Sequence, residues 1–328
     1  MELRAVVREP GAFQQPVSAA EISALLARTL GEDVRAARVT ELATGTYNNT
    51  YRVDLEDGDS VVLRVAPPPS LQHRGDRQAM RNEHAATPLL AGLGRLVPQT
   101  LAVDFTHEVL GRDALVQELL PGVSASAVVL SWQPARRAEL FRALGTVTRT
   151  VHSVRGTAFG RVAGPTRTAW SVATAEHLLD LAADLDDLGG DGTEIRRVAD
   201  AAERHADELD ELSVPRLLHG DLWLLNVLVA VDGDTRITGV LDHDAACWGD
   251  PAGDWTLEKI REGAVTERDA FWETYGPPPD TSPVRTLFAR ARTVAGTRLD
   301  VQRRGILDQV PRHYWDLRPV LEQLGEVF

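Results

Sequence analysis

The chain has 328 residues, of which 43% are hydrophobic, and its formal net charge is -13 at pH 7. The hydrophobic content suits a folded core and argues against intrinsic disorder, whereas the negative charge argues against a nucleic-acid partner, whose phosphates need a basic surface. The N-terminus shows no signal-like segment, and no apolar run approaches the roughly 18 residues that span a bilayer. We therefore expect a cytoplasmic protein without a membrane partner.

Two residue types are nearly absent from the chain. Cys247 is the only cysteine, so a disulfide within one chain and a thiolate metal cluster are excluded. Lys259 is the only lysine, so arginine must fill nearly every cationic role. The use of arginine in place of lysine becomes important at Arg64.

The first third of the chain predicts a helix followed by a β-rich lobe. Ser18 and Glu21 have the spacing of a capping box, and apolar residues then recur at helical intervals. Three β-rich runs, "VRAARVTEL", "TYRVDLEDG" and "SVVLRVAPP", predict consecutive antiparallel strands. A helix over "DRQAMRNEHAATPLLAGLG" and strands near 99–104 and 113–119 would complete a five-stranded antiparallel sheet with one packed helix.

The composition changes after the Pro-Gly linker in "LLPGVS". Helical patterns then dominate, and one apolar face combines Leu140, Phe141, Leu144, Val147 and Val151. Two short strand-like segments, "NVLVAV" and "RITGVLD", flank a turn at Asp232 and Gly233. We expect an α+β protein with a small lobe over residues 1–120 and a larger, mainly helical lobe over residues 121–328.

The hairpin predicted in the second lobe carries polar residues suited to chemistry. Asp221 and Asn226, in "LLHGDLWLLN", precede its first strand, and Asp242, in "GVLDHDAACWGD", ends its second strand. The hairpin would therefore bring all three close together. A carboxylate and an amide oxygen are hard ligands suited to Mg²⁺, while a second carboxylate can orient a hydroxyl and take its proton.

These motifs resemble those of the aminoglycoside phosphotransferase family, which are relatives of the protein kinases. "HGDLWLLN" is similar to the family's catalytic loop, "LDHD" to its magnesium-binding motif, and "GDPAGDW" to the segment that follows in many members. Further pieces occur in the family's order: "LATGTYNNTYRV" as a nucleotide-covering loop, "VVLRV" as the third strand, and "LVQELLPG" as the hinge between lobes. The resemblance covers most of the chain and implies a protein-kinase-like two-lobe fold.

The resemblance also implies roles for individual residues. Asp221 would be the catalytic aspartate, and Asn226 and Asp242 would hold Mg²⁺ between the phosphates of ATP or GTP. His219 would support the catalytic loop. The nucleotide would be bound by residues of the covering loop, the third strand, the following helix and the hinge: Thr44, Gly45, Thr46, Arg64, Glu83, Glu118 and Leu120.

Two departures from the kinase pattern leave alternatives open. Arg64 stands where protein kinases have lysine. Its guanidinium can form a bidentate interaction with a phosphate or with Glu83. Alternatively, Arg64 is simply an outward-facing residue of a half-buried strand. The covering loop has a single glycine, Gly45, so Thr44, Thr46 and Asn48 would supply donors unless the segment is an ordinary hairpin turn.

Three functions remain open at this stage. We expect an enzyme, a kinase that transfers a γ-phosphoryl group to a hydroxyl of a small molecule, and specifically an antibiotic-resistance kinase. The first alternative is a metabolic kinase of a sugar, amino alcohol or fructosamine, because "HGDLW" also resembles the loop of fructosamine kinases. The second is a pseudokinase-like binding module, which Arg64 and the glycine-poor loop would suit.

The acceptor pocket should be built by residues 160–190 and 265–328, where Trp170 and His177 are among the candidates. The acidic stretch from Asp180 to Glu194 either attracts a cationic acceptor or simply faces solvent, as runs of like charge usually do. We expect a monomer or a homodimer.

Overall fold

The computed structural model describes residues 1–8, 13–43, 45, 47–230 and 234–325. The chain divides into two compact units. Unit 1 contains Met1–Gln72, Asp76–Ala127 and Leu224–Asp244, and unit 2 contains His73–Gly75, Val128–Trp223 and Ala245–Phe328. The hairpin that follows the HGD motif therefore packs with the N-terminal residues, although it comes late in the sequence. The division into nucleotide-binding and acceptor-binding lobes stays a prediction.

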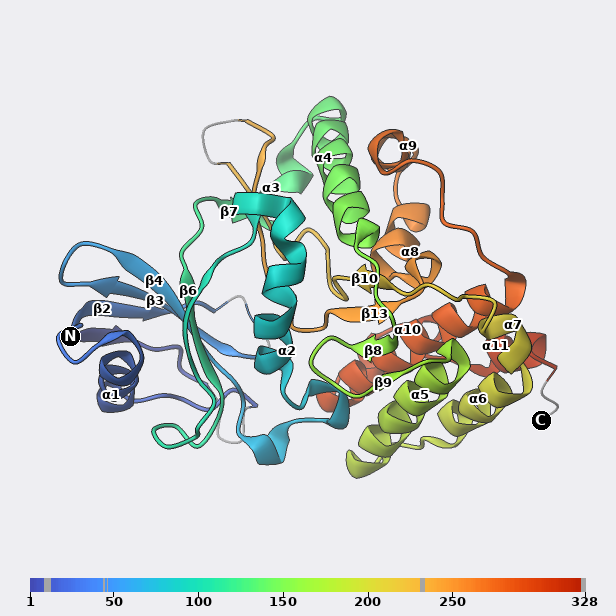
Figure 1. Cartoon of the computed structure of the whole chain (residues 1–328), viewed down its shortest axis with the longest axis horizontal. Helices are drawn as coiled ribbons and strands as arrows, with labels where there is room; N and C mark the ends of the chain where they lie inside the picture. Colours follow the sequence, from blue (N-terminus) through green and yellow to red (C-terminus); the bar gives the residue numbers. More distant parts are fainter. Residues whose placement is uncertain (9–12, 44, 46, 231–233, 326–328) are drawn as a thin grey trace. The chain divides into compact units, whose positions relative to one another are not determined.

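Unit 1 is built on a six-stranded sheet in the order β1-β2-β3-β4-β6-β5 (Figure 1). The strands are β1 (Glu2–Arg4), β2 (Ala36–Glu41), β3 (Asn49–Leu55), β4 (Ser60–Val65), β5 (Thr100–Asp104) and β6 (Ala114–Glu118). The five predicted antiparallel strands are all present, and β1 adds a parallel edge strand beside β2. The sequence did not indicate β1, because three residues are too short to show an alternating pattern.

Both faces of this sheet are covered. Helix α1 (Ala19–Leu30) begins at the predicted capping box of Ser18 and packs its apolar face on one side of the sheet. Successive strand residues point to opposite faces, so Val116 joins this core while Leu115 packs against Met80 on the other side. Met80 belongs to α2 (Ala79–Ala86), the helix predicted to pack on the sheet. The face shared by Leu115 and α2 is the one that receives Arg64.

The predicted long helix is in fact divided. The α-helical part ends at Ala86, and the backbone continues as the 3-10 helix η3 (Thr87–Leu96). Pro88 explains the change, because proline has no backbone N–H to extend an α-helical ladder and is accommodated only where a new helix starts.

The predicted late hairpin consists of β11 (Val227–Val229) and β12 (Ile237–Val240), which pair antiparallel. A third strand, β7 (Val123–Ser124), pairs with β11 from its other side. The turn predicted at Asp232 and Gly233 lies outside the described residues.

Unit 2 combines helices with a small antiparallel sheet in the order β10-β13-β8-β9. The sheet strands are β8 (Phe159–Arg161), β9 (Thr166–Arg167), β10 (Arg216–Leu218) and β13 (Cys247–Gly249). The helices are α4 (Pro134–Ser153), α5 (Trp170–Asp187), α6 (Thr193–Arg204), α7 (Ala206–Leu209), α8 (Trp255–Glu262), α9 (Val265–Tyr275), α10 (Pro283–Arg303) and α11 (Arg318–Gln323), and the short α3 (Ala125–Val128) lies where the chain enters the unit. Helices α5, α6 and α10 lie side by side over one core (Figure 1).

The apolar face predicted for α4 is buried throughout. The protein therefore has the expected α+β fold, with a β-rich N-terminal part and a mainly helical C-terminal part. Within the described residues, no helix combines the length and apolar character needed to cross a bilayer.

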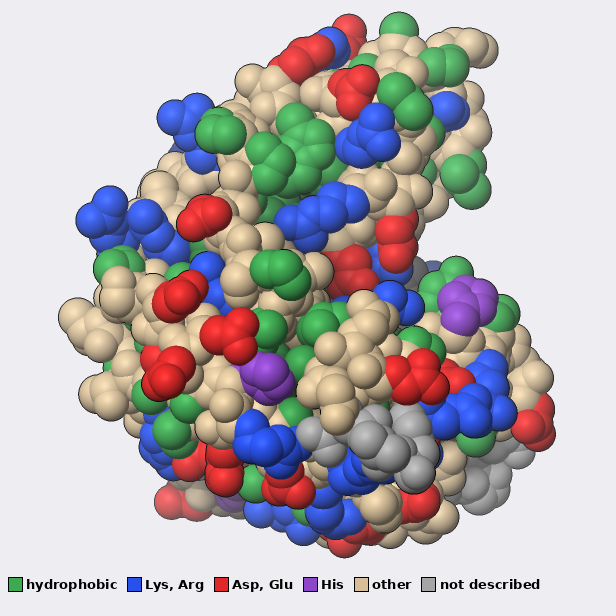
Figure 2. All heavy atoms as spheres, turned by 90° about the vertical axis from the view of Figure 1, so that its right-hand side faces the viewer, with side chains coloured by type: hydrophobic (Ala, Val, Ile, Leu, Met, Phe, Trp, Pro, Cys, Tyr) green, Lys and Arg blue, Asp and Glu red, His purple; other side chains and the backbone are tan. Residues whose placement is uncertain are grey.

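The acidic stretch of unit 2 is largely neutralised by arginines. Asp184 and Asp187 accept ion pairs from Arg74 at 2.7 and 2.6 Å. Further along the stretch, Asp186 pairs with Arg196, and Glu194 pairs with Arg298 at 2.8 Å. Basic and acidic side chains are likewise interspersed over the face shown in Figure 2. This stretch therefore offers no concentrated negative field for a cationic acceptor.

Candidate active site

Arg64 is a buried residue of β4 and not an outward one, because only 7% of it is exposed. It lies opposite Leu115 of β6 and points to the face covered by α2. There its guanidinium forms an ion pair with Glu83, whose side chain is completely buried. Gln117 also donates a hydrogen bond to the Glu83 carboxylate, at 2.8 Å. The pairing of Arg64 with Glu83, one of the alternatives left open by the sequence, is therefore present, and its contact with a nucleotide stays a prediction.

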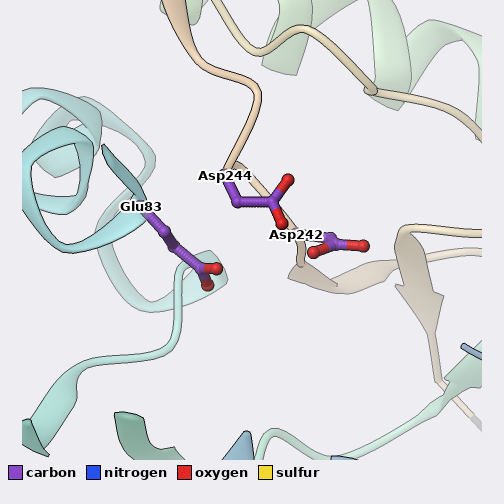
Figure 3. A group of neighbouring side chains, drawn as sticks. All are labelled: Glu83, Asp242 and Asp244. Atoms are coloured by element: carbon purple, nitrogen blue, oxygen red, sulfur yellow. The ribbon is translucent and has the colours of Figure 1, made fainter. Parts of the chain in front are cut away.

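The same arginine also reaches the loop after β12. Its second terminal nitrogen forms an ion pair with Asp242 and lies 3.7 Å from a carboxylate oxygen of Asp244. Figure 3 shows Glu83, on α2, and the two aspartates of the loop as neighbouring side chains. One carboxylate oxygen from each residue lies within 4.8 Å of the others. The cluster formed by Arg64, Glu83, Asp242 and Asp244 is named the acidic cluster below.

Electrostatics explain why the arginine stays charged. Burial disfavours a charged guanidinium, but the nearby carboxylates outweigh it and raise the pKa of Arg64. Burial raises the pKa of the Glu83 carboxyl, and Arg64 opposes this rise. Three carboxylates facing one guanidinium leave the acidic cluster with an excess of acidic groups, which suits a further cation.

The loop that carries the two aspartates is held by α2 and η3. Asn82 donates a hydrogen bond to the backbone oxygen of Asp244 at 2.8 Å, and the Thr87 hydroxyl contacts the His243 ring at 2.9 Å. His243 is fully buried, and burial, followed by the nearby Arg64, lowers its pKa to about 4, so the ring is neutral at pH 7. Asp242 itself adopts a left-handed backbone with φ 63°, which aspartate tolerates better than most residues.

Asn226 lies beside this loop. Its backbone oxygen accepts a hydrogen bond from the backbone N–H of Leu241 at 2.8 Å. Asn226 therefore lies across the hairpin from Leu241, the residue that precedes Asp242. The expected proximity of Asn226 and Asp242 is therefore present in unit 1. Their roles as magnesium ligands stay a prediction.

The covering loop is supported by residues that the sequence pattern did not reveal. Gln14 donates hydrogen bonds to the backbone oxygens of Gly45 and Asn48 at 3.2 and 2.7 Å. The rings of Phe13 and Tyr47 lie 5.1 Å apart. Residues of the N-terminal segment therefore contact the covering loop, in which Gly45 is the single glycine. Thr44 and Thr46, predicted to bind nucleotide, lie outside the described residues.

The predicted hinge residues lie at the end of β6 and just after it. Glu118 is the last residue of this strand, is exposed, and pairs with Val61 of β4. Leu120 is half-buried. Contact of either residue with a nucleotide stays a prediction.

Asp221 lies in unit 2, directly after β10. Gly220, with φ 86°, makes this turn possible, because a Cβ atom there would collide with the carbonyl oxygen of Ala245. His219 is buried, and its Nδ1 atom accepts a hydrogen bond from the backbone of Asp221 at 3.4 Å. The histidine therefore supports the loop, as expected.

A buried hydrogen-bond chain supports the residues after Asp221. The Thr256 hydroxyl donates to the backbone oxygen of Leu222 at 3.0 Å, and Asp254 accepts from the Thr256 backbone at 2.9 Å. Asp254 also contacts Nε2 of His152 at 2.7 Å, and Nδ1 of His152 contacts the Tyr275 hydroxyl at 2.9 Å. Burial alone would raise the pKa of Asp254, but these donors lower it, so the carboxylate stays ionised. This chain explains the second aspartate, Asp254, of the "GDPAGDW" motif.

Comparison with known proteins identifies the family. A profile of the phosphotransferase enzyme family (APH) matches residues 38–287, which is most of the chain. The chain belongs to this family. It is therefore a small-molecule O-phosphotransferase by family. A search among curated proteins gives no match.

Solved structures show the same fold in family members. Aminoglycoside phosphotransferase APH(4)-Ia is 16% identical, with a TM-score of 0.61, and the match covers 94% of this chain and 100% of that one. Macrolide 2'-phosphotransferase MphH from Brachybacterium faecium is 19% identical, with a TM-score of 0.52 and coverages of 92% and 97%. A protein from Thermobifida fusca proposed to be a fructosamine-3-kinase is 19% identical, with a TM-score of 0.58 and coverages of 93% and 100%.

Proposed function

We propose that this phosphotransferase moves the γ-phosphoryl group of ATP or GTP to a hydroxyl of a small molecule, with Mg²⁺ as cofactor. The acidic cluster is the observation that carries the proposal. In this cluster, Arg64 of β4 forms a buried ion pair with Glu83 of α2 and also reaches Asp242, the aspartate after the hairpin. An arrangement of this kind would bind and neutralise the phosphates of a nucleotide.

The donor set fits a magnesium ion. Carboxylate and amide oxygens are the hard ligands that Mg²⁺ takes, and the acidic cluster supplies three carboxylates within 4.8 Å of one another. Asp242 and Asn226 would hold the ion, and Asp244 would support it. When bound, the ion would neutralise the charge that develops on the transferred phosphoryl group. Arg64 would remain paired with Glu83 and use its second nitrogen for a phosphate oxygen.

Asp221 would act on the acceptor. Its carboxylate would orient the acceptor hydroxyl and take its proton, while the hydroxyl oxygen forms a bond to the γ-phosphorus. The bond between that phosphorus and the bridging oxygen breaks, and the nucleoside diphosphate leaves with the electron pair. His219 and Gly220 support the backbone of this loop, so the carboxylate would be positioned before the substrate binds.

We infer an antibiotic as the acceptor, which would make this a resistance kinase. The support is the family together with its structural neighbours. One of them, a thermostable mutant of APH(4)-Ia, was solved with AMP-PNP and hygromycin B. The fructosamine-kinase neighbour keeps a metabolic acceptor as the second candidate.

A mass-spectrometric screen tests the proposal. The protein is incubated with Mg²⁺ and ATP or GTP and with antibiotics, sugars and amino alcohols, using Asp221→Ala as the blank and the exposed Asp207→Ala as the matched control. We expect a product that is 80 mass units heavier, about the mass of one added phosphoryl group, with the parent and Asp207→Ala only. Asp221→Ala should lose at least roughly a thousandfold in rate while nucleotide affinity changes only a few-fold.

Comparable turnover by Asp221→Ala would remove that residue from its role. Nucleotide binding without any product would favour a pseudokinase-like module, and the absence of nucleotide binding would contradict the proposal as a whole.

A further inference from the structure

The connection between β4 and α2 leaves unit 1 and then returns to it. His73–Gly75 belong to unit 2, whereas the residues on both sides, Met1–Gln72 and Asp76–Ala127, belong to unit 1. These three residues therefore pack with a different part of the protein from their neighbours in sequence. His73–Gly75 are named the strap below.

The strap is held in unit 2 mainly by one carboxylate. The backbone N–H of Arg74 donates to the two carboxylate oxygens of Asp184 of α5, at 3.0 and 2.9 Å, and its guanidinium donates to the same carboxylate at 2.7 Å. The guanidinium also donates to Asp187 at 2.6 Å, and Arg161 of β8 donates to the backbone oxygen of Gly75. Side chains of α5 and β8 thus hold both the backbone and the side chain of the strap.

The burial of Asp184 indicates that this contact is specific. Only 2% of Asp184 is exposed, and the residue lies beside the buried Leu181 and Leu185 on α5. A buried carboxylate is costly unless charged or hydrogen-bonding groups surround it. Among the described residues, every hydrogen bond to this carboxylate comes from Arg74. Helix α5 therefore carries a buried charge that the strap compensates.

The residues after the strap lead to the proposed nucleotide site. The backbone oxygen of Asp76 accepts a hydrogen bond at 3.4 Å from the hydroxyl of Tyr47, in the covering loop. Helix α2 begins at Ala79, five residues after Arg74, and carries Glu83 of the acidic cluster. Five residues span at most about 18 Å, so a strap bound to Asp184 limits how far the start of α2 can move.

We propose that the strap is a conformational device that couples nucleotide binding in unit 1 to the contact with Asp184 in unit 2. A strap bound to Asp184 holds α2 and the Tyr47 end of the covering loop in the arrangement that binds a nucleotide. A released strap leaves both free to move, so the nucleotide binds more weakly. The coupling is reciprocal, and a bound nucleotide therefore keeps the strap on Asp184.

This inference rests on the proposed function, because the ligand is the nucleotide of the kinase reaction, and it goes beyond that function by adding a control on nucleotide affinity. Arg74 and Asp184 are positioning residues, which act on the nucleotide site through the strap.

Hydrogen exchange and nucleotide titration of the full chain test the inference. Exchange of the backbone amides of residues 72–78 is measured by mass spectrometry with and without Mg²⁺ and AMP-PNP or GMP-PNP, whichever binds the parent more tightly. Calorimetry measures the affinity for the same analogue. The variants are Asp184→Asn, Arg74→Ala and the control Glu176→Gln, which removes an exposed carboxylate of the same helix from its pair with Arg167.

We expect the analogue to slow exchange of residues 72–78 in the parent and in Glu176→Gln. Asp184→Asn and Arg74→Ala should exchange faster in this segment and bind the analogue about tenfold more weakly. The double variant should bind no more weakly than Asp184→Asn alone, because both substitutions remove the same contact.

Unchanged nucleotide affinity in both Asp184→Asn and Arg74→Ala, or strap exchange in the parent that does not respond to the analogue, would overturn the inference. A contact that only stabilises unit 2 would give this result, with a lower thermal stability as its sole effect. If Asp184→Asn does not fold, Arg74→Ala decides, because the Arg74 side chain is 33% exposed and its backbone hydrogen bonds to Asp184 can still form.

The kinase function fails by a different result. Nucleotide binding and a strap response, without phosphoryl transfer to any acceptor, would contradict the kinase function alone. Phosphoryl transfer by a parent whose strap does not respond to the nucleotide would contradict the role of the strap alone.

Discussion

In unit 1, the carboxylates of Glu83, Asp242 and Asp244 gather around one guanidinium, whereas in unit 2 the carboxylate of Asp254 is enclosed by His152 and Thr256. The first arrangement has more acidic groups than its single cation can neutralise, and Asp242 remains 39% exposed in its side chain. The second arrangement is closed and fully hydrogen-bonded. Acidic residues of similar chemistry therefore indicate a ligand site in one place and a structural support in the other.

The largest effect is expected from removing the cation of the acidic cluster. Arg64→Gln leaves Glu83 buried without its charge partner and should lower the free energy of unfolding by about 4 kcal/mol. Mg²⁺ should restore more stability to this variant than to the parent, because the freed carboxylates can bind it. Thermal unfolding with and without Mg²⁺ measures both effects. Equal Mg²⁺ responses of variant and parent would show that the acidic cluster is not a metal site.

The buried His243 should make stability depend on pH. Its pKa is about 4 in the folded protein against an ordinary value of 6.5, so the unfolded chain alone takes up a proton between these values. The free energy of unfolding should therefore fall as the pH drops from 6.5 to 4, by about 3 kcal/mol in total. Urea unfolding at several pH values should show this slope in the parent and in the exposed-site control His313→Gln, and a smaller slope in His243→Gln.

A smaller loss is expected at the closed arrangement. Asp254→Asn keeps the shape of the side chain but removes the charge that His152 and Thr256 stabilise, at a cost of about 2 kcal/mol. Mg²⁺ should not restore this stability, in contrast to Arg64→Gln. A Mg²⁺-dependent rescue of Asp254→Asn would mean that the two arrangements do not differ as described.

The smallest effect concerns the covering loop. Gln14→Ala removes two hydrogen bonds to the loop backbone and should weaken nucleotide binding by about 1 kcal/mol, with little change in thermal stability. Titration with a non-hydrolysable ATP analogue measures the affinity. Gln15→Ala is the neighbouring control, and equal affinities of the two variants would show that the support from Gln14 does not affect nucleotide binding.

Local patterns in the sequence predicted much of this molecule. The five strands β2 to β6, the capping box at Ser18 and the apolar face of α4 are all present. The resemblance also placed Arg64 and Glu83 correctly as neighbours on β4 and α2. These predictions succeeded because each depends on residues close in sequence or on a motif with fixed spacing.

Other features could not be predicted because they join residues far apart in the chain. The bonds from Asn82 to Asp244 and from Gln14 to Asn48 leave no repeating signal in the sequence. The same holds for Arg292 of α10, whose guanidinium lies 5.0 Å from the centre of the Trp170 ring of α5. The division of the long helix at Pro88 was readable in principle, since proline marks the start of a new helix.

The arginine at position 64 has a consequence for chemical probing. A guanidinium stays protonated at neutral pH and is a poor nucleophile, so amine-reactive nucleotide probes that label a kinase lysine should not react at this position. The only lysine, Lys259, lies on α8 and pairs with Glu262 at 3.0 Å. Apart from the N-terminal amine, acylating reagents should therefore modify this protein at one side chain, which gives an attachment point for a dye or a surface at a residue outside the acidic cluster.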